Sequence, residues 1–510
     1  MKSEKSNNLL LILFILFSIL IKLFSSSSYF FISMDETKYL KLAKNLPFYN
    51  LFNNNFYISH PPFYPFVIKM FSFIMSDYIA GISLSQISTI GFILTGCIFL
   101  KLLKTEYRNL YIIITLTGLS HLLYYWSNII YKETFFSFLV YLFLLCFFLV
   151  IIKPQKILVV FTAIIGFLLS FTSDLVIFLF PSILCMILLY GKSLLRNKQY
   201  SVILLPIISI VTGYGIWIGI RLWIYTHNTY YPAGVDGMIE QVASWNIFHI
   251  FSPRSFQWTK EITQSGLSLE PLHYIKYISA LFNLLPPLHI SLTSFSTKEI
   301  FLILIVYIPL AIFMCIGIFT VIQNKEKTGY LMLVTFFSFL SPIIFQISDP
   351  RFSLPSLIPL FYFIGTGIMK VCSKMKSELL ILPFFVFSIF WIIQNPYFYG
   401  FKQKVVQLEK TGKFINNLTE DGIMAQFGYP PEIAYLTDKR VICLPLTVEE
   451  LEHQLSIYDI HYIIFGEDET YNGKVINYIK NSPQEFTKIT EIEEIYPHQK
   501  EKVYVFKVKK

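Results

Sequence analysis

The sequence predicts a polytopic α-helical membrane protein with about eleven membrane-spanning helices and a small soluble α/β domain at its C-terminus. Hydrophobic residues make up 55% of the 510-residue chain and charged residues only 14%, which is about half the charged share of a typical soluble domain. Runs of about twenty apolar residues recur between Leu9 and Trp391. From residue 397 onward the composition changes to that of an ordinary soluble protein.

The apolar runs define the predicted spans. We expect the first run to be a retained signal anchor, because Lys2 and Lys5 precede it and no small-residue cleavage site follows it. The approximate bounds are 9–33, 78–100, 110–130, 134–152, 157–172, 175–191, 200–225, 299–321, 328–347, 352–370 and 377–395.

The basic residues indicate which side of the membrane each loop faces. They gather in alternate short loops, at 101–108, 153–156, 192–198, 325–327 and 374–376. All of these loops fall on the cytoplasmic side when the N-terminus is cytoplasmic, as the positive-inside rule requires. We therefore expect a plasma-membrane protein with a cytoplasmic N-terminus and an extracytoplasmic C-terminal domain.

Charge and cysteine patterns exclude several classes of site. The net charge of +9 comes with no basic helix and no basic-aromatic interleaving, so nucleic acid is not an expected partner. The six cysteines show no CxxC pair and no paired framework, so neither a structural zinc site nor disulfide cross-linking is indicated.

The predicted organisation is a membrane module at 1–396, with outer loops at 34–77 and 226–298, followed by a soluble domain at 397–510. Residues 34–46 have the pattern of an amphipathic helix, with Tyr39, Leu42, Ala43 and Leu46 on one side and Lys38, Lys41 and Lys44 elsewhere. Such a helix is expected to lie in the membrane interface. Pro61 and Pro62 then favour the start of another short helix that runs through Met75.

The tail has the alternating pattern of a small α/β domain. It predicts helices at 402–418 and 448–458, and strands at 423–427, 441–444 and 461–465. It has no glycine-rich phosphate loop. We expect this domain to cap the membrane module or to recognise an acceptor, rather than to catalyse a reaction.

Chemically distinctive residues recur on the predicted outer face. Asp35 and Glu36 directly follow the first span, and His60-Pro61-Pro62-Phe63-Tyr64-Pro65 comes about twenty-five residues later. Glu133 opens the predicted span at 134–152, and Asp174 lies in the next outer turn. Arg351 stands in Asp349-Pro350-Arg351-Phe352-Ser353-Leu354-Pro355, at the outer end of a late span. Charged groups at membrane depth are costly and tend to mark a working cavity.

This ordered set resembles the GT-C glycosyltransferases, in particular the protein O-mannosyltransferase and aminoarabinose transferase group. The family's acidic pattern in the first outer loop is matched by Asp35, Glu36, Tyr39 and Ala43. Its [KH]-P-P-[LF] motif is matched by His60 to Phe63, and its late arginine segment by Arg351, Phe352, Leu354 and Pro355, with the final proline displaced by one place to Pro359. Where relatives carry an arginine near the fifth loop, this chain has Thr172-Ser173-Asp174.

The resemblance implies an inverting glycosyltransferase that takes a sugar from a polyprenyl-phosphate donor and passes it to a protein, lipid or glycan acceptor. It implies that Asp35 is the general base, that Glu36 supports it or holds an acceptor or a metal, and that Arg351 and His60 contact the donor phosphate. Guanidinium matches phosphate oxygens in pairs, which favours Arg351 over His60. Glu133, Asp174, Tyr39 and Tyr64 are expected to line the cavity. No cofactor is certain; some relatives use a divalent metal and others do not.

Two other functional classes fit a polytopic chain. A polymerase or ligase for lipid-linked glycans also has many spans and large outer loops, but an acidic pair directly after the first span is not expected there. A transporter usually shows paired repeats and polar residues at mid-membrane, and neither is evident in this sequence.

Overall fold

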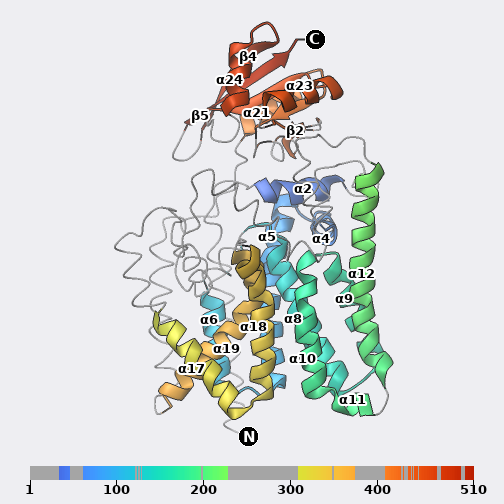
Figure 1. The fold of residues 1–510 in the computed structure, drawn as a ribbon, viewed down its shortest axis with the longest axis vertical. Helices are drawn as coiled ribbons and strands as arrows, with labels where there is room; N and C mark the ends of the chain where they lie inside the picture. The colour runs from blue at the N-terminus through green and yellow to red at the C-terminus, as the bar shows by residue number, and fades with distance from the viewer. Residues whose placement is uncertain are drawn as a thin grey trace. The chain divides into compact units, whose positions relative to one another are not determined.

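The structure is a computed structural model that describes residues 34–45, 61–227, 308–346, 350–373 and 408–509 (Figure 1). Short gaps within these ranges lie at 121–122, 124–126, 128, 197–198, 427–428, 430–432, 434, 438, 440, 446, 468–472 and 496–499. The predicted spans at 9–33 and 377–395, and the loop at 226–298 beyond residue 227, lie outside the described residues.

The chain divides into two compact units. The first, which we call the helical unit, contains the described residues of 82–219 and of 308–373. The second, the mixed unit, contains 34–45, 61–81, 220–227 and 408–509. The mixed unit thus joins the segment after the first predicted span to the C-terminal part of the chain.

The helical unit consists of helices that match most of the predicted spans. They are α5 (Asp77–Leu102), α6 (Tyr107–Leu119), α8 (Lys132–Ile152), α9 (Lys156–Ser170), η2 (Asp174–Leu179), α10 (Phe180–Tyr190), α11 (Lys192–Arg196), α12 (Tyr200–His227), α17 (Ile308–Asn324), α18 (Lys327–Gln346), η5 (Pro350–Ser356) and α19 (Leu357–Val371). The span predicted at 175–191 is matched by the apolar helix Asp174–Tyr190, which begins with the 3-10 turn η2 and continues as α10, with Pro181 in the first turn of α10.

Four helices among the described residues are long and apolar enough to cross a membrane, namely Asp77–Leu102, Lys132–Ile152, Tyr200–Ile220 and Ser353–Val371. Shorter apolar helices accompany them at Lys156–Ser170, Asp174–Tyr190 and Ile308–Asn324. The total of about eleven spans stays a prediction.

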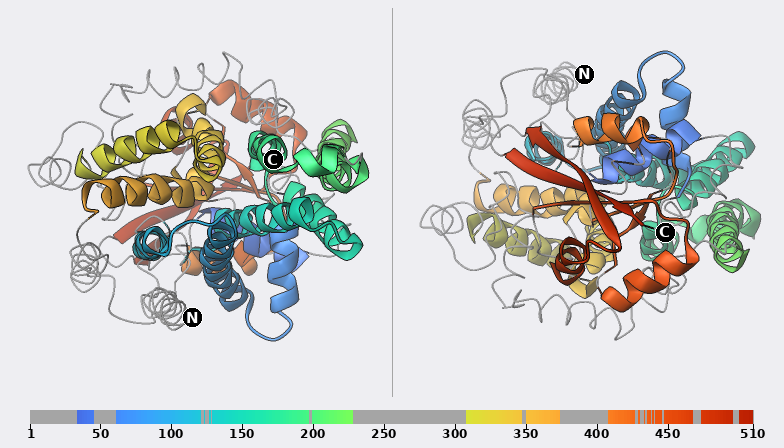
Figure 2. Two further views of the ribbon diagram at one scale, coloured as in Figure 1. Left: turned by 90° about the horizontal axis from the view of Figure 1, so that it is seen from below. Right: turned by 90° about the horizontal axis from the view of Figure 1, so that it is seen from above.

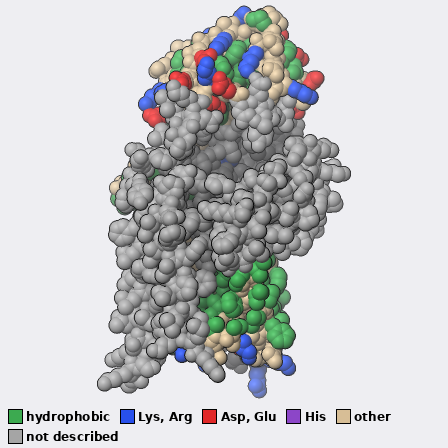
Figure 3. Space-filling model, turned by 90° about the vertical axis from the view of Figure 1, so that its left-hand side faces the viewer, with side chains coloured by type: hydrophobic (Ala, Val, Ile, Leu, Met, Phe, Trp, Pro, Cys, Tyr) green, Lys and Arg blue, Asp and Glu red, His purple; other side chains and the backbone are tan. Residues whose placement is uncertain are grey.

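The surface of the helical unit is apolar where a soluble protein would be polar. Large hydrophobic side chains are exposed along several helices: Ile87 and Ile98 of α5, Ile157, Val160, Phe161 and Ile164 of α9, Leu204, Leu205, Ile208 and Val211 of α12, and Ile312, Phe319 and Ile322 of α17. On the face drawn in Figure 3, hydrophobic side chains form a band with Lys and Arg side chains at its lower end. Contiguous exposed apolar surface of this kind needs a lipid solvent.

Small residues let the helices approach closely. A Cβ atom added to Gly317 of α17 would collide with the backbone carbonyl of Phe363 in α19, and one added to Gly367 of α19 would collide with the carbonyl of Phe313. The two helices therefore meet backbone to backbone at both glycines. Without a hydrophobic drive between helices in lipid, such van der Waals contact is a main source of helix association.

Hydrogen bonds between helices add to this packing. The Ser170 hydroxyl of α9 donates to the Ile210 carbonyl of α12 at 2.9 Å. The Asn109 amide of α6 donates to the Thr366 hydroxyl of α19, also at 2.9 Å. Because these donors lie in apolar helices, pairing with a neighbouring helix spares the Ser170 hydroxyl and the Asn109 NH2 group the cost of being left unsatisfied.

Three of the basic loops lie together at one end of the helical unit. The Thr328 hydroxyl donates to the Leu103 carbonyl at 3.0 Å and lies 3.5 Å from the Tyr190 hydroxyl. The Lys327 ammonium lies 5.8 Å from the centre of the Tyr190 ring. The turns after α5, α10 and α17 are thus neighbours, as the charge pattern of the sequence predicts.

The mixed unit contains a five-stranded sheet in the order β2-β1-β3-β5-β4. Its elements are α2 (Met34–Asn45), α4 (Phe63–Phe71), α21 (Glu409–Asn416), β1 (Ile423–Ala425), β2 (Val441–Cys443), α23 (Val448–Ile457), β3 (Tyr462–Gly466), α24 (Gly473–Asn481), β4 (Phe486–Ile495) and β5 (Lys500–Val508). Strands β1, β2 and β3 pair in parallel, whereas β5 is antiparallel to both β3 and β4. Figure 2 shows this twisted sheet with helices on both sides.

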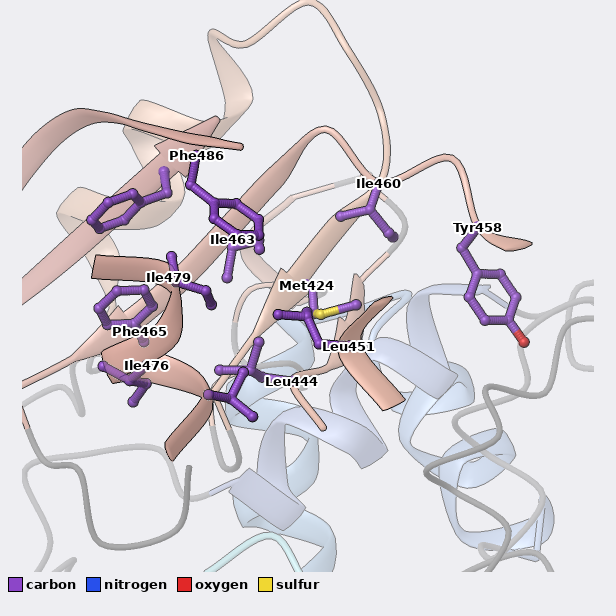
Figure 4. Close-up of a cluster of buried hydrophobic side chains, with 12 residues drawn as sticks. Met424, Leu444, Leu451, Tyr458, Ile460, Ile463, Phe465, Ile476, Ile479 and Phe486 are labelled. Atoms are coloured by element: carbon purple, nitrogen blue, oxygen red, sulfur yellow. The ribbon is translucent and has the colours of Figure 1, made fainter. Parts of the chain in front are cut away.

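Two hydrophobic cores cover the two faces of the sheet, because neighbouring strand residues point to opposite faces. Met424, Ile463 and Phe465 pack with side chains of α23 and α24 in the core drawn in Figure 4. Ile423, Ala425, Tyr462 and Ile464 face the other way, toward Ile415 of α21. The first turn of α21 is fixed by the buried Glu494 carboxylate, which accepts from the Thr411 backbone N–H at 2.6 Å and from its hydroxyl at 2.7 Å.

The secondary structure predicted for the tail is correct in the first half of the tail and incomplete in the second half. The strands near 423, 441 and 461 and the helix at 448–458 are confirmed as β1, β2, β3 and α23. Of the helix predicted at 402–418, the described part is α21. The sequence did not predict α24, β4 or β5. The predicted boundaries of the soluble domain at 397–510 stay a prediction.

The contact between α17 and α19 generates a stability prediction. Gly367→Ala should destabilise the protein by about 1–3 kcal/mol, because its Cβ meets backbone that cannot rotate away. The control is Gly215→Ala in α12, where an added Cβ has no neighbour within 4 Å. Thermal unfolding in detergent measures both variants, and equal midpoints would contradict the close crossing.

Candidate functional site

Helix α2 carries the acidic pair near its start. It spans Met34–Asn45, as the amphipathic pattern predicts, with Asp35 as its second residue and Glu36 as its third. Carboxylates are stabilised at this end of a helix by its exposed N–H groups. The Glu36 side chain is only 1% exposed, so this carboxylate lies within the protein rather than on its surface.

Tyr39 and Tyr64 are brought together by α2 and α4. Their ring centroids are 5.1 Å apart, with the planes at 86°, and both rings are buried. This edge-to-face contact is a favoured aromatic geometry. Helix α4 begins after Pro62, as predicted, but it ends at Phe71 and does not reach Met75. Tyr64, on α4, therefore packs against Tyr39 of α2.

Glu133 and Asp174 both lie at helix starts in the helical unit. Glu133 is the second residue of α8, and its side chain is 3% exposed. Asp174 opens η2 directly after Ser173, whose hydroxyl accepts from the Leu175 N–H at 3.4 Å. The Asp174 side chain is 9% exposed. Both positions suit a carboxylate near a helix N-terminus, so burial alone does not assign them a role in catalysis.

The backbone of Arg351 lies in η5, the 3-10 turn between α18 and α19. This turn packs on α8 and on α18. The buried Tyr141 hydroxyl of α8 donates to the Pro355 carbonyl at 3.0 Å, four residues beyond Arg351. The Tyr141 ring is in turn flanked by Phe92 and Phe99 of α5. The arginine segment is therefore held to α8 by a hydrogen bond that the sequence analysis did not identify.

Glu133, Asp174 and Arg351 lie at the same end of the helical unit. Helices α9 and α18 start at the basic loops and run away from them to reach η2 and η5. Helix α8 runs the opposite way, since Phe148 near its end contacts Tyr190 at the basic end. Its first turn, with Glu133, is therefore at the end where η2 and η5 lie.

Helix α2 is attached to the C-terminal part of the chain. The Lys41 ammonium donates to the Thr437 backbone carbonyl at 3.0 Å, and the Lys44 ammonium lies 4.2 Å from the centre of the Tyr435 ring. The Lys41 side chain is buried, which its predicted place away from the apolar side of the helix did not indicate. The hydrogen bond from Lys41 to Thr437 replaces the contact with water that an exposed ammonium would make. Burial raises the pKa of Tyr435, and the negative charge of Asp77 raises it further.

The predicted site residues thus fall into two groups. Asp35, Glu36, Tyr39 and Tyr64 belong to the mixed unit, and Glu133, Asp174 and Arg351 belong to the helical unit. That the two groups line one cavity stays a prediction. His60 lies outside the described residues.

Among the described residues, no group of three or more His, Cys, Asp or Glu side chains is placed to hold a metal ion. A divalent metal at the acidic pair with His60 therefore stays a prediction.

Comparison with known proteins identifies the fold. No protein-family model matches the sequence, and no curated protein matches it. The chain is similar to the crystal structure of ArnT from Cupriavidus metallidurans bound to undecaprenyl phosphate, with a TM-score of 0.54, 10% identity and 97% of each chain covered.

A second similarity is to an oligosaccharyltransferase of Archaeoglobus fulgidus in complex with Zn and sulfate. The TM-score is 0.53 at 12% identity, covering 89% of this chain and 67% of that chain. The archaeal oligosaccharyltransferase AglB, from the same organism, in complex with an inhibitory peptide and a dolichol-phosphate, gives 0.53 at 11% identity, covering 89% and 69%. These are GT-C superfamily membrane glycosyltransferases, so the chain has the GT-C fold.

The hydrogen bond from Tyr141 to the Pro355 carbonyl, in the arginine segment, generates a second prediction. Tyr141→Phe should cost about 1 kcal/mol and raise hydrogen exchange at residues 353–357, because it leaves the buried Pro355 carbonyl without this donor. Tyr190→Phe is the control, since the Tyr190 hydroxyl lies 3.5 Å from the Thr328 hydroxyl, at the opposite end of the helical unit. Unchanged exchange in Tyr141→Phe would show that the hydrogen bond does not hold the turn.

Proposed function

We propose that this protein is a glycosyltransferase that moves a sugar from a polyprenyl-phosphate donor to an acceptor hydroxyl on the extracytoplasmic face of the plasma membrane. The observation that carries the proposal is the acidic pair at the start of a buried helix, in a chain with the GT-C fold. Solved structures with this fold hold undecaprenyl phosphate or dolichol-phosphate, which supports the lipid-phosphate class of donor.

In the proposed reaction, Asp35 takes the proton of the acceptor hydroxyl as its oxygen attacks the anomeric carbon. The bond between the anomeric carbon and the phosphate oxygen breaks, and its electron pair stays on that oxygen. The products are the glycosylated acceptor, with inverted anomeric configuration, and the free polyprenyl phosphate. A phosphate departs readily without being protonated, so the reaction needs no general acid.

The supporting roles follow from charge and burial. The Arg351 guanidinium stabilises the negative charge on the departing phosphate through paired hydrogen bonds, with His60 as a second contact. Glu36, buried beside Asp35, supports the base rather than meeting the acceptor. Glu133, Asp174, Tyr39 and Tyr64 keep their predicted role as residues that line the cavity. The acceptor class of protein, lipid or glycan stays open.

The test is an assay of the purified protein with a panel of polyprenyl-phosphate sugars. The proposal expects free polyprenyl phosphate to appear by mass spectrometry together with a glycosylated acceptor or released sugar. A transporter would bind the lipid without consuming it. A glycan polymerase or ligase would require an oligosaccharide on the donor.

Asp35→Asn should lower the transfer rate by about 100-fold or more, because the base is lost while size and shape are kept. The matched control is Glu106→Gln, an exposed carboxylate at the turn before α6. Expression and donor binding should stay at the wild-type level in both variants. Full transfer by Asp35→Asn would remove Asp35 from the mechanism.

Arg351→Ala should weaken binding of the donor, or of undecaprenyl phosphate as its stand-in, by about 10- to 100-fold, because hydrogen bonds to a charged phosphate are lost. Arg108→Ala serves as the control, since this exposed arginine lies in the first turn of α6, directly after a basic loop. Native mass spectrometry in detergent measures the lipid-bound fraction. Donor affinity unchanged in Arg351→Ala would exclude this residue from the phosphate site.

A further inference from the structure

Helix α2 has a fixed attachment point within the mixed unit. The Lys41 side chain is 9% exposed, and its ammonium donates to the Thr437 carbonyl at 3.0 Å. A buried ammonium is costly unless it is hydrogen-bonded, so this contact restricts where Lys41, and the helix that carries it, can lie.

The segment whose carbonyl accepts the hydrogen bond from Lys41 is held in place by further hydrogen bonds and by the hydrophobic core. The Thr437 N–H and hydroxyl both donate to the Ile433 carbonyl, at 2.9 and 2.7 Å. The Ile433 side chain is fully buried in the core with Ile423 and Ile464 of the sheet. The Leu436 carbonyl accepts from the Asn416 amide of α21 at 3.1 Å. The carbonyl that holds α2 is therefore part of the domain core and not of a loose loop.

A second contact lies one helical turn beyond Lys41. The Lys44 ammonium faces the Tyr435 ring at 4.2 Å, within the range of a cation–π interaction. Tyr435 is half-buried and is close enough to feel the charge of Asp77, the first residue of α5. The segment that contains Tyr435 and Thr437 therefore contacts α2 at two lysines, Lys41 and Lys44.

The attachment lies on the same rigid helix as the acidic pair. Asp35 precedes Lys41 by six residues, which is about 9 Å along a helix. A small tilt about Lys41 therefore moves the Asp35 carboxylate, and a displacement of about 1 Å at a reacting group can cost about 100-fold in rate.

We propose that Lys41 is a positioning residue, through which residues 433–437 of the C-terminal domain hold α2 and its acidic pair in the geometry needed for transfer. The C-terminal domain then acts on the reaction without supplying a group to it. The catalytic part of this inference rests on the proposed function, and the structural part does not.

The test uses the full-length protein in lipid nanodiscs. Lys41→Met removes the ammonium and keeps an apolar stem, whereas Lys41→Arg keeps a donor. Lys69→Met is the matched control, since Lys69 is a half-buried lysine of α4 in the same unit. Hydrogen exchange of residues 34–45 and steady-state transfer kinetics are measured for each variant.

We expect Lys41→Met to raise exchange in α2 and to lower kcat by about 10- to 100-fold, with the donor KM within about twofold of wild type. Lys41→Arg should recover most of both losses, and Lys69→Met should match wild type. Exchange in β3 and β5 reports whether the domain remains folded. Where Lys41→Met does not fold, Tyr435→Leu provides a milder break of the same attachment, with the same expected direction.

Wild-type exchange in α2 together with wild-type kcat in Lys41→Met would overturn the inference. A rise in KM with kcat unchanged would also overturn it, because it would indicate a role in binding donor. If the wild-type protein consumes no donor, the proposed function fails. The exchange measurement then still decides whether Lys41 holds α2.

Discussion

The buried ammonium of Lys41 joins the helix that carries the acidic pair to the C-terminal part of the mixed unit. An amphipathic helix after a membrane span would ordinarily lie at the lipid surface with its lysines in water. In this protein Lys41 is buried against Thr437, and Lys44 faces Tyr435. These contacts bind a helix from the start of the chain to a domain near its end. The helix with the acidic pair is therefore a shared element of two distant parts of the sequence.

The helical unit obeys a different constraint, because lipid cannot satisfy polar backbone groups or drive helices together. Its helices associate through glycines such as Gly317 and Gly367, and through hydrogen bonds from Asn109 and Ser170. Lipid also solvates charged side chains poorly, so they lie at the ends of these helices. Basic loops occupy one end of the unit, and the turns with Glu133, Asp174 and Arg351 occupy the other. A separation of this kind suits a reaction at one membrane face.

The sequence predicted the elements whose signal is local. The apolar run at 134–152 predicts a membrane-spanning helix, and α8 matches it. Strand β4 was missed because charged residues interrupt its apolar pattern at the edge of the sheet. Strand β5 was missed although Val503 to Phe506 is an apolar run typical of a strand. The sequence also could not distinguish Lys41 from Lys38 and Lys44, since which lysine is buried depends on residues 433–437. The Tyr141 contact with Pro355 depends likewise on a distant partner.

The chemical claim at the centre of this account is a single displacement at the anomeric carbon, with a carboxylate of α2 as base and not as nucleophile. The anomeric configuration of the transferred sugar, compared by NMR with that of the donor, tests it most directly. Inversion is the predicted result, since one attack by the acceptor oxygen reverses the configuration. Retention would contradict the account, because it requires two displacements through a covalent glycosyl-enzyme intermediate.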